Sequence, residues 1–216
     1  FKQKTAYEIK ECDWSSDVCS SDLLQMISYI IAHDKIDVII FEDYNKGLIT
    51  PKLIQKVVEL AKEKGIPTAV DPKKKNFLAY KGVTMFKPNL KELKEGLKLD
   101  FDTENIAEIQ RAISSFRVKQ KFETAIVTLS ERGVLTNSRK VKEHLPAHIR
   151  TIADVSGAGD TVISIAALCR ALNVHPVLTA ALSNLAGGLV CERVGVVPID
   201  KELLLQEALR LDFVKK

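Results

Sequence analysis

Cysteine and tryptophan are scarce in this chain, and no long uncharged apolar run occurs. The 216 residues include one tryptophan and four cysteines, at positions 12, 19, 169 and 191. Cys169 and Cys191 lie in apolar stretches typical of helices, so we expect them to be buried thiols rather than part of a disulfide framework. No run reaches the length needed to cross a bilayer. We therefore expect no membrane partner and a reducing, cytoplasmic location.

Two common nucleotide-binding motifs are also missing. The pattern G-x-x-x-x-G-K-[ST] occurs nowhere, which argues against a P-loop NTPase. A dinucleotide-binding fingerprint needs a third glycine after Gly157 and Gly159, but Val162 stands in that place, and the pair comes late in the chain rather than after an early strand. A Rossmann oxidoreductase is therefore disfavoured.

The charge balance is only mildly basic. The chain carries 32 lysine and arginine residues against 28 aspartate and glutamate residues, a net charge of +4. The charges are scattered, apart from one run at Lys73–Lys75. Nucleic-acid binding would call for denser basic patches interleaved with aromatic residues. We expect small anionic partners instead.

The first 23 residues have neither a helical nor a strand period. The stretches FKQKTAYEI and DWSSDVCSSDL resemble in-frame translations of the two fixed parts of a short-read sequencing adaptor. We therefore expect residues 1–23 to be non-native and assign the fold to residues 24–216, which are enough for one α/β domain. A disordered native tail is the alternative.

Residues 24–216 alternate between amphipathic helical patterns and short, buried-strand patterns. This alternation predicts an α/β fold with a mostly parallel sheet and helices on both faces. Ligands of such sheets gather at the carboxyl ends of the strands. The expected helices cover about 24–33, 51–64, 89 onward, 103–118, 157–172, 176–193 and 200–214. The expected strands cover 36–41, 66–70, 83–86 and 124–129, followed by two antiparallel strands within 133–145 around Asn137-Ser138.

The stretch Asp154-Val155-Ser156-Gly157-Ala158-Gly159-Asp160 carries the strongest chemical signal. Small residues at 157–159 let successive N–H groups point at one place, and the helix that follows adds the positive end of its dipole. Asp160 is a carboxylate beside this anion hole and is placed to accept a proton. Such a pair suits phosphoryl transfer. An ordinary turn capped by Ser156 and Asp160 is the alternative.

Polar residues follow the first two expected strands. Asp43, Tyr44 and Lys46 lie in a loop that ends at Gly47, and Lys73 follows Asp71-Pro72 at the end of the next strand. Lys73 is a candidate for a phosphate contact. A polar loop without a ligand is the alternative for the first segment.

Further candidates follow later strands. Asn89 and Glu92 have the spacing of a capping box, and Glu92 is also suited to hold a water of a hydrated Mg²⁺ ion. Thr128 and Gly133 flank a strand end, where they either line a nucleotide or form a hairpin turn. Asn184 lies on a small-residue helix face that either admits an adenine or packs against another helix.

Taken together, these stretches resemble the PfkB family of ribokinase-like carbohydrate kinases. The order and spacing of FEDYNKG, VDPKKKNF, FKPNLKEL, VTLSERG, DVSGAGDTV and ALSNLAGGLVCERVG are most similar to its heptose 7-phosphate kinase branch. The resemblance implies a three-layer sandwich, ATP and Mg²⁺ as cofactors, and a sugar phosphate as substrate. It implies Asp160 as catalytic base and Gly157, Ala158 and Gly159 as anion hole. The other implied roles are ATP contacts at Asn89, Leu90, Lys91, Glu92, Thr128, Gly133 and Asn184, substrate or phosphate contacts at Asp43, Tyr44, Lys46 and Lys73, and a water-mediated metal contact at Glu92 and Asn89.

The resemblance also implies an incomplete domain. Such kinases begin with a further stretch that carries much of the sugar pocket and a small β lid, through which related kinases often form homodimers. We expect that part to be missing here, so residues 24–216 correspond to the C-terminal two-thirds of the domain. Two alternatives stay open: a PfkB kinase for another sugar or a nucleoside, and a non-catalytic sugar-phosphate or nucleotide-binding module.

Overall fold

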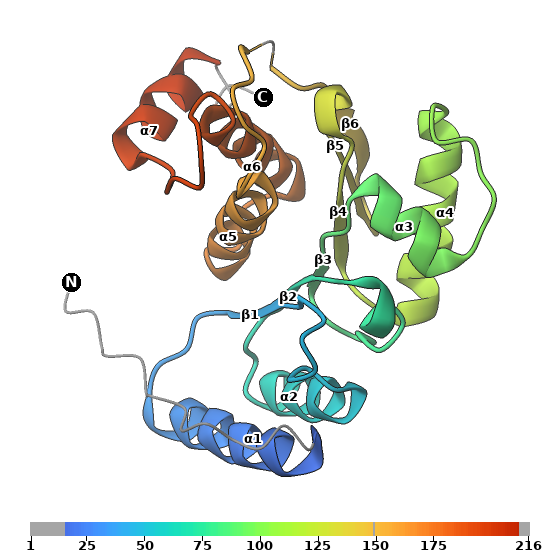
Figure 1. Ribbon diagram of the computed structural model, residues 1–216, viewed down its shortest axis with the longest axis vertical. Helices are drawn as coiled ribbons and strands as arrows, with labels where there is room; N and C mark the ends of the chain where they lie inside the picture. The colour runs from blue at the N-terminus through green and yellow to red at the C-terminus, as the bar shows by residue number, and fades with distance from the viewer. Residues whose placement is uncertain (1–15, 149, 212–216) are drawn as a thin grey trace.

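Six strands form one sheet in the computed structural model, which describes residues 16–148 and 150–211 (Figure 1). Strands β1 to β4 run parallel, and β5 and β6 are antiparallel additions at one end. The strands lie side by side in chain order, so the carboxyl ends of β1 to β4 share one edge of the sheet. Their bounds are β1 Ile39–Glu42, β2 Thr68–Asp71, β3 Met85–Phe86, β4 Thr124–Thr128, β5 Val134–Ser138 and β6 Lys142–Leu145.

Helices cover both faces of this sheet (Figure 1). Val70 and Phe86 face a core shared with the first four helices, whereas Ala69 and Met85 face a second core beneath α5 and α6. The predicted three-layer α/β architecture is therefore confirmed. The first group is α1 (Ser16–His33), α2 (Pro51–Glu63), α3 (Leu90–Leu97) and α4 (Ile106–Gln120); the second is α5 (Ala158–Ala171) and α6 (Pro176–Val190), with α7 (Lys201–Arg210) against α6.

Aromatic packing holds the short strand β3 in place. The ring of Phe86 lies 5.0 Å from Phe77, 5.4 Å from Phe116 and 5.1 Å from Phe122, centroid to centroid. Aromatic rings at such distances attract each other beyond their buried area. A strand of two residues has few ladder hydrogen bonds, so these contacts help to fix where residues 87–89 emerge at the sheet edge.

The first helix begins earlier than expected. The sequence predicts a start near residue 24, but α1 begins at Ser16. Leu23 is half-buried against the same core as Leu24 and Ile27, so it extends their apolar face toward the N-terminus. Residues 1–15 lie outside the described part of the chain, and the non-native origin of residues 1–23 stays a prediction.

The predicted turn at Asn137-Ser138 is wrong. Both residues belong to β5, and the chain turns at residues 139–141. The Asn137 side chain is fully buried, where it accepts a hydrogen bond from Arg117 and donates to Gln110 and Ser114 of α4. These tertiary contacts outweigh the turn preference of asparagine.

Strand β1 lies at the open end of the sheet. It pairs with β2 alone among the described strands, which leaves Ile40 38% exposed. An unpaired strand offers free N–H and C=O groups to another chain or segment. In the described residues, no helix is both long and apolar enough to cross a membrane.

Candidate active site

The turn before α5 is shaped by hydrogen bonds to the Asp154 carboxylate. Its carboxylate accepts hydrogen bonds from the Ser156 N–H (2.9 Å), the Ser156 hydroxyl (2.8 Å) and the Gly195 N–H (3.0 Å). The two bonds from Ser156 are the main reason why the pKa of Asp154 lies below its usual range. Asp154 therefore fixes the shape of the turn.

Some backbone N–H groups of this turn are hydrogen-bonded within the turn, and three others in the described residues are not. The Ala158 N–H bonds Val155 O (3.3 Å) and the Thr161 N–H bonds Gly157 O (2.9 Å). Within residues 16–148 and 150–211, the N–H groups of Gly157, Gly159 and Asp160 meet no protein acceptor. Free N–H groups at the start of a helix attract anions. Of the predicted anion hole, Gly157 and Gly159 thus offer free donors, while the Ala158 donor is engaged.

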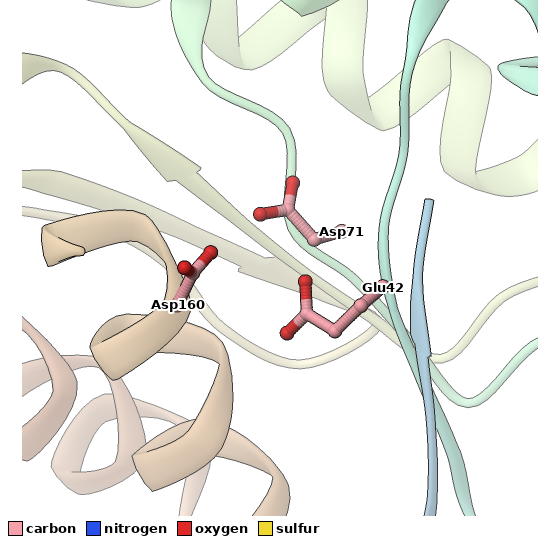
Figure 2. Close-up of side chains that lie close together, drawn as sticks. All are labelled: Glu42, Asp71 and Asp160. Carbon is pink, nitrogen blue, oxygen red and sulfur yellow. The ribbon is translucent and has the colours of Figure 1, made fainter. Parts of the chain in front are cut away.

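Three carboxylates converge beside this turn. Figure 2 shows Asp160 on the first turn of α5 pointing toward Glu42 and Asp71 at the ends of β1 and β2. One oxygen of each lies within 4.8 Å of the others. Burial, together with the negative charges of Asp71 and Asp160, raises the pKa of Glu42 to about 7. Glu42 was not among the residues predicted from the sequence, although it is the last residue of the strand before the loop that carries Asp43, Tyr44 and Lys46.

Replacing Glu42 with glutamine should flatten the pH dependence of stability in metal-free buffer. The pKa of Glu42 is about 7 in the folded protein against an ordinary 4.5. Between these values the folded state holds a proton that the unfolded chain releases, so the free energy of unfolding falls as pH rises. After discounting for its partial exposure, Glu42→Gln should gain on the order of 1–2 kcal/mol at pH 8 and almost nothing at pH 4.

Urea unfolding of both proteins from pH 4 to 8 measures this effect. The exposed Glu63→Gln on α2 removes the same formal charge and serves as the control. A parallel decline of stability in wild type and Glu42→Gln over this range would contradict the assignment.

Two lysines form ion pairs with the Asp71 carboxylate. Lys87, which follows β3, donates to Asp71 Oδ2 at 2.9 Å and is only 2% exposed. Lys73 lies 3.6 Å from Asp71 Oδ1 and also donates to Glu92. Burial alone would lower the pKa of Lys73, but its carboxylate partners outweigh this and raise it. Sequence reasoning missed Lys87 because a lone lysine after a strand looks like an ordinary surface residue.

The loop after β1 places only some of its predicted residues at the site. Asp43 is buried, and its carboxylate accepts hydrogen bonds from the Asn45 N–H, Asn76 and Tyr80. Asp43 therefore shapes the loop from inside. Tyr44 is exposed, and its hydroxyl donates to Asp160 Oδ2 at 3.0 Å. The exposed Lys46 is the remaining loop candidate.

The Tyr44 phenol should report directly on Asp160. The hydrogen bond to Asp160 is the main reason why the pKa of Tyr44 lies above its ordinary value of 10.0. Asp160→Asn removes the negative charge, so the pKa of Tyr44 should move down toward that value. Titration of ¹³C-labelled tyrosine followed by NMR measures the shift, with Tyr29 as an internal control. An unchanged Tyr44 titration would show that the two groups do not meet in solution.

The start of α3 is a complete capping box. The Asn89 side chain accepts from the Glu92 N–H (2.8 Å), and Glu92 Oε2 accepts from the Asn89 N–H (2.9 Å). Glu92 Oε1 accepts from Lys73. The half-buried Leu90 packs against the core, and Lys91 is exposed. An isolated parallel bridge joins Asn89 to Thr128, which brings these two candidates together.

These donors can be tested against the divalent ion that the resemblance implies. Both oxygens of Glu92 already accept protein hydrogen bonds, so a hydrated ion there would compete with Lys73 and the helix cap. The carboxylates of Glu42, Asp71 and Asp160 form a second oxygen donor set, and Asp71 Oδ1 is buried without a hydrogen-bond partner. Mg²⁺ prefers oxygen ligands and retains waters. The second set fits such an ion better.

The last candidates gather around Pro146. Asn184 on α6 donates to Pro146 O at 2.9 Å. Gly133 lies against the same segment: a Cβ added there would come within 2.1 Å of Leu145 O. The absence of a side chain at position 133 is thus explained by close backbone packing. Asn184 and Gly133 lie near each other through this segment, and their nucleotide contacts stay a prediction.

One chain of contacts links the α3 start to the α5 turn. Glu92 contacts Lys73, Lys73 contacts Asp71, Asp71 contacts Lys87, and Lys87 Nζ lies 3.5 Å from Gly159 O. A parallel α/β sheet thus presents an anion-binding turn, a carboxylate and two lysines at the carboxyl ends of its strands. This combination is typical of enzymes that handle phosphates.

Comparison with known proteins gives the family. The model of the pfkB family carbohydrate kinases matches residues 26–202, so the chain belongs to that family. The bifunctional protein HldE of Syntrophotalea carbinolica is 37% identical over 172 residues, covering 79% of this chain and 35% of the relative. Its counterpart in Campylobacter jejuni is 32% identical, covering 96% and 44%. The chain thus spans less than half the length of these curated relatives.

Solved structures support the ribokinase-like fold. Phosphofructokinase-2 from Escherichia coli superposes with a TM-score of 0.78 at 15% identity, covering 88% of this chain and 62% of that one. Ribokinase from Arabidopsis thaliana, solved with ribose and ATP, gives a TM-score of 0.67 at 17% identity, covering 86% and 58%. At such identities these neighbours establish the fold alone.

Proposed function

We propose that this chain is the greater part of an ATP-dependent sugar kinase domain, whose substrate is D-glycero-β-D-manno-heptose 7-phosphate and whose phosphate acceptor is the anomeric hydroxyl. The observation that carries the proposal is the position of Asp160. Its carboxylate lies on the same turn as the free N–H groups of Gly157 and Gly159. A proton acceptor beside an anion-binding turn is what transfer of a phosphoryl group to an alcohol requires.

The proposed roles follow from this placement. Asp160 accepts the proton of the sugar hydroxyl as the γ-phosphoryl group moves in line toward it. The N–H groups of the 157–160 turn stabilise the charge on the phosphoryl oxygens, and they need no reorganisation to do so. Tyr44 and Lys46 approach the sugar phosphate. Lys73, which pairs with Asp71 and Glu92, contacts a phosphate group of the bound substrates.

A divalent ion fits the same arrangement. Glu42, Asp71 and Asp160 offer the carboxylate oxygens for it, and Glu92 and Asn89 remain the alternative through water. When bound, Mg²⁺ would offset the negative charge of the ATP phosphates. The adenosine part of ATP would extend toward Thr128, Gly133 and Asn184.

The sugar assignment depends on similarity to the HldE proteins rather than on the geometry. Their identities of 32–37% exceed those of the phosphofructokinase and ribokinase neighbours, 15% and 17%. We extend the proposal to the cytoplasm, where ATP is available, because the two described cysteines are buried and free. The open flank of β1 supports a further part of the kinase domain upstream.

An ADP-release assay tests the proposal. The chain, and the same chain joined to the upstream part of a related kinase, are each supplied with ATP, Mg²⁺ and one of four acceptors: the heptose 7-phosphate, fructose 6-phosphate, ribose or adenosine. We expect the extended protein to prefer the heptose phosphate and the chain alone to be weaker. Preference for another acceptor would overturn the sugar assignment. Absence of acceptor-dependent ADP release by the extended protein would overturn the kinase assignment.

A further inference from the structure

Lys87 is a buried cation that the proposed reaction does not use. It follows β3 and is 2% exposed, although lysine is almost never buried without a partner. Its ammonium group has two protein acceptors, Asp71 Oδ2 at 2.9 Å and Gly159 O at 3.5 Å. One acceptor lies at the end of β2 and the other in the first turn of α5. Lys87 therefore connects the sheet to the helix that carries the anion-binding turn.

Lys87 also lies close to the backbone at position 159. A Cβ built on Gly159 would lie 3.4 Å from Lys87 Nζ and 3.8 Å from Asp71 Oδ2. Both are ordinary van der Waals distances, so even a methyl group at position 159 would touch the lysine. The turn therefore lies directly against the Lys87–Asp71 pair.

The contact between Lys87 and the Gly159 carbonyl also affects a backbone donor of the anion-binding turn, because the carbonyl and the donor belong to one peptide unit. A trans peptide unit is planar, and its C=O and N–H point in opposite directions. When Lys87 holds the Gly159 carbonyl, it also sets the direction of the Asp160 N–H, which belongs to the same peptide unit. That N–H is one of the three donors without a protein acceptor in the described part of the chain. The amide would then point away from the lysine, toward the open start of α5.

We infer that Lys87 is a positioning residue for phosphoryl transfer: it joins Asp71 to Gly159 and so fixes the backbone donors that receive the γ-phosphate. The inference depends on the proposed function. It adds a residue from β3 that acts through the anion-binding turn and need not touch the substrate. The exposed hydrogen bond from Tyr44 to Asp160 is the other side-chain contact that ties this turn to the sheet edge among the described residues.

The test separates positioning from folding. Lys87→Met alone would leave the buried Asp71 carboxylate with Lys73, at 3.6 Å, as its remaining cation. The informative comparison is therefore between Asp71→Asn and Asp71→Asn/Lys87→Met. Asp71→Asn keeps Lys87 and its Gly159 acceptor, although the ammonium group loses its carboxylate partner. The double variant loses the contact with Gly159 and removes both buried charges. Lys74→Met removes an exposed lysine between β2 and β3 and serves as the control.

Two measurements on these variants test whether Lys87 positions the backbone donors. Calorimetry with Mg²⁺ compares AMP-PNP, which carries a γ-phosphate, with ADP, which does not. We expect the double variant to bind AMP-PNP about tenfold more weakly than Asp71→Asn while ADP affinity changes by less than twofold. Hydrogen exchange of the amides of residues 159–161 should become faster in the double variant and stay unchanged in Lys74→Met.

The possible outcomes distinguish the role of Lys87 from the kinase assignment. Equal AMP-PNP affinity in Asp71→Asn and the double variant, or unchanged exchange, overturns the role of Lys87 and leaves the kinase assignment standing. Equal losses for AMP-PNP and ADP also overturn it, because they would indicate general damage. If the wild-type chain binds neither nucleotide, the proposed function is overturned, and this inference with it.

Discussion

Replacing Asp160 with asparagine should lower turnover by about 10²–10⁴-fold, the range expected when a general base is removed. Asparagine has nearly the same shape and keeps an oxygen that can accept the Tyr44 hydrogen bond, but it cannot take up a proton at neutral pH. The N–H groups of the turn and the nucleotide surface are untouched, and the amide oxygen of asparagine, with Glu42 and Asp71, can still face a divalent ion. ATP affinity should therefore change by less than about threefold, and the loss should appear in kcat rather than in KM.

The measurement is steady-state kinetics of the heptose-phosphate-dependent ADP release, made in the extended protein if the chain alone is too slow. Ser164→Ala is a matched control, because Ser164 is exposed one turn further along α5 and its hydroxyl bonds the Asp160 carbonyl. It should retain activity within about twofold. Equal turnover of Asp160→Asn and wild type would remove Asp160 as the base.

The sequence predicted elements better than it predicted the contacts between them. Strand–helix alternation gave the parallel sheet and the helices on both faces, because the 2.0 and 3.6 residue periods reflect burial directly. The capping box at Asn89 and Glu92 was predicted correctly, since capping is a local interaction. Asn137 was placed in a turn because its partners on α4 are 20 to 27 residues away in sequence.

The same distinction holds for the candidate site: residues in short motifs could be predicted, and residues defined by contacts between distant segments could not. Residues of the 154–160 motif and the loop after β1 could be selected because their chemistry is concentrated in short strings. Glu42 and Lys87 could not, because each acquires its importance from neighbours on other strands. The sheet topology brings their strand ends to one edge, and only there do a third carboxylate and a buried ammonium group become visible. Asp43 shows the converse: its polar side chain points inward to Tyr80 and Asn76.

Lys87→Met should be the most destabilising single substitution at this edge. The side chain of Lys87 is 3% exposed and that of Asp71 is 7% exposed. Removing the lysine leaves a carboxylate in a poorly hydrated place, with Lys73 at 3.6 Å as its remaining cation. Breaking a buried ion pair in this way costs about 3–5 kcal/mol. Urea unfolding at pH 7 measures the loss, and Lys74→Met, whose side chain is 70% exposed, should stay within about 0.5 kcal/mol of wild type.

A double-mutant cycle then measures the interaction between Lys87 and Asp71. Asp71→Asn/Lys87→Met replaces two buried charges by neutral groups of similar size, which is often neutral for stability because two desolvation costs disappear together. We expect the double variant to recover most of what Lys87→Met loses, with a coupling energy of about 2–3 kcal/mol. Additive losses would mean that the two side chains do not interact. Recovery of stability in the double variant, with AMP-PNP binding still weaker than in Asp71→Asn, would show that Lys87 serves the geometry of the anion-binding turn, since a neutral pair would serve the fold as well.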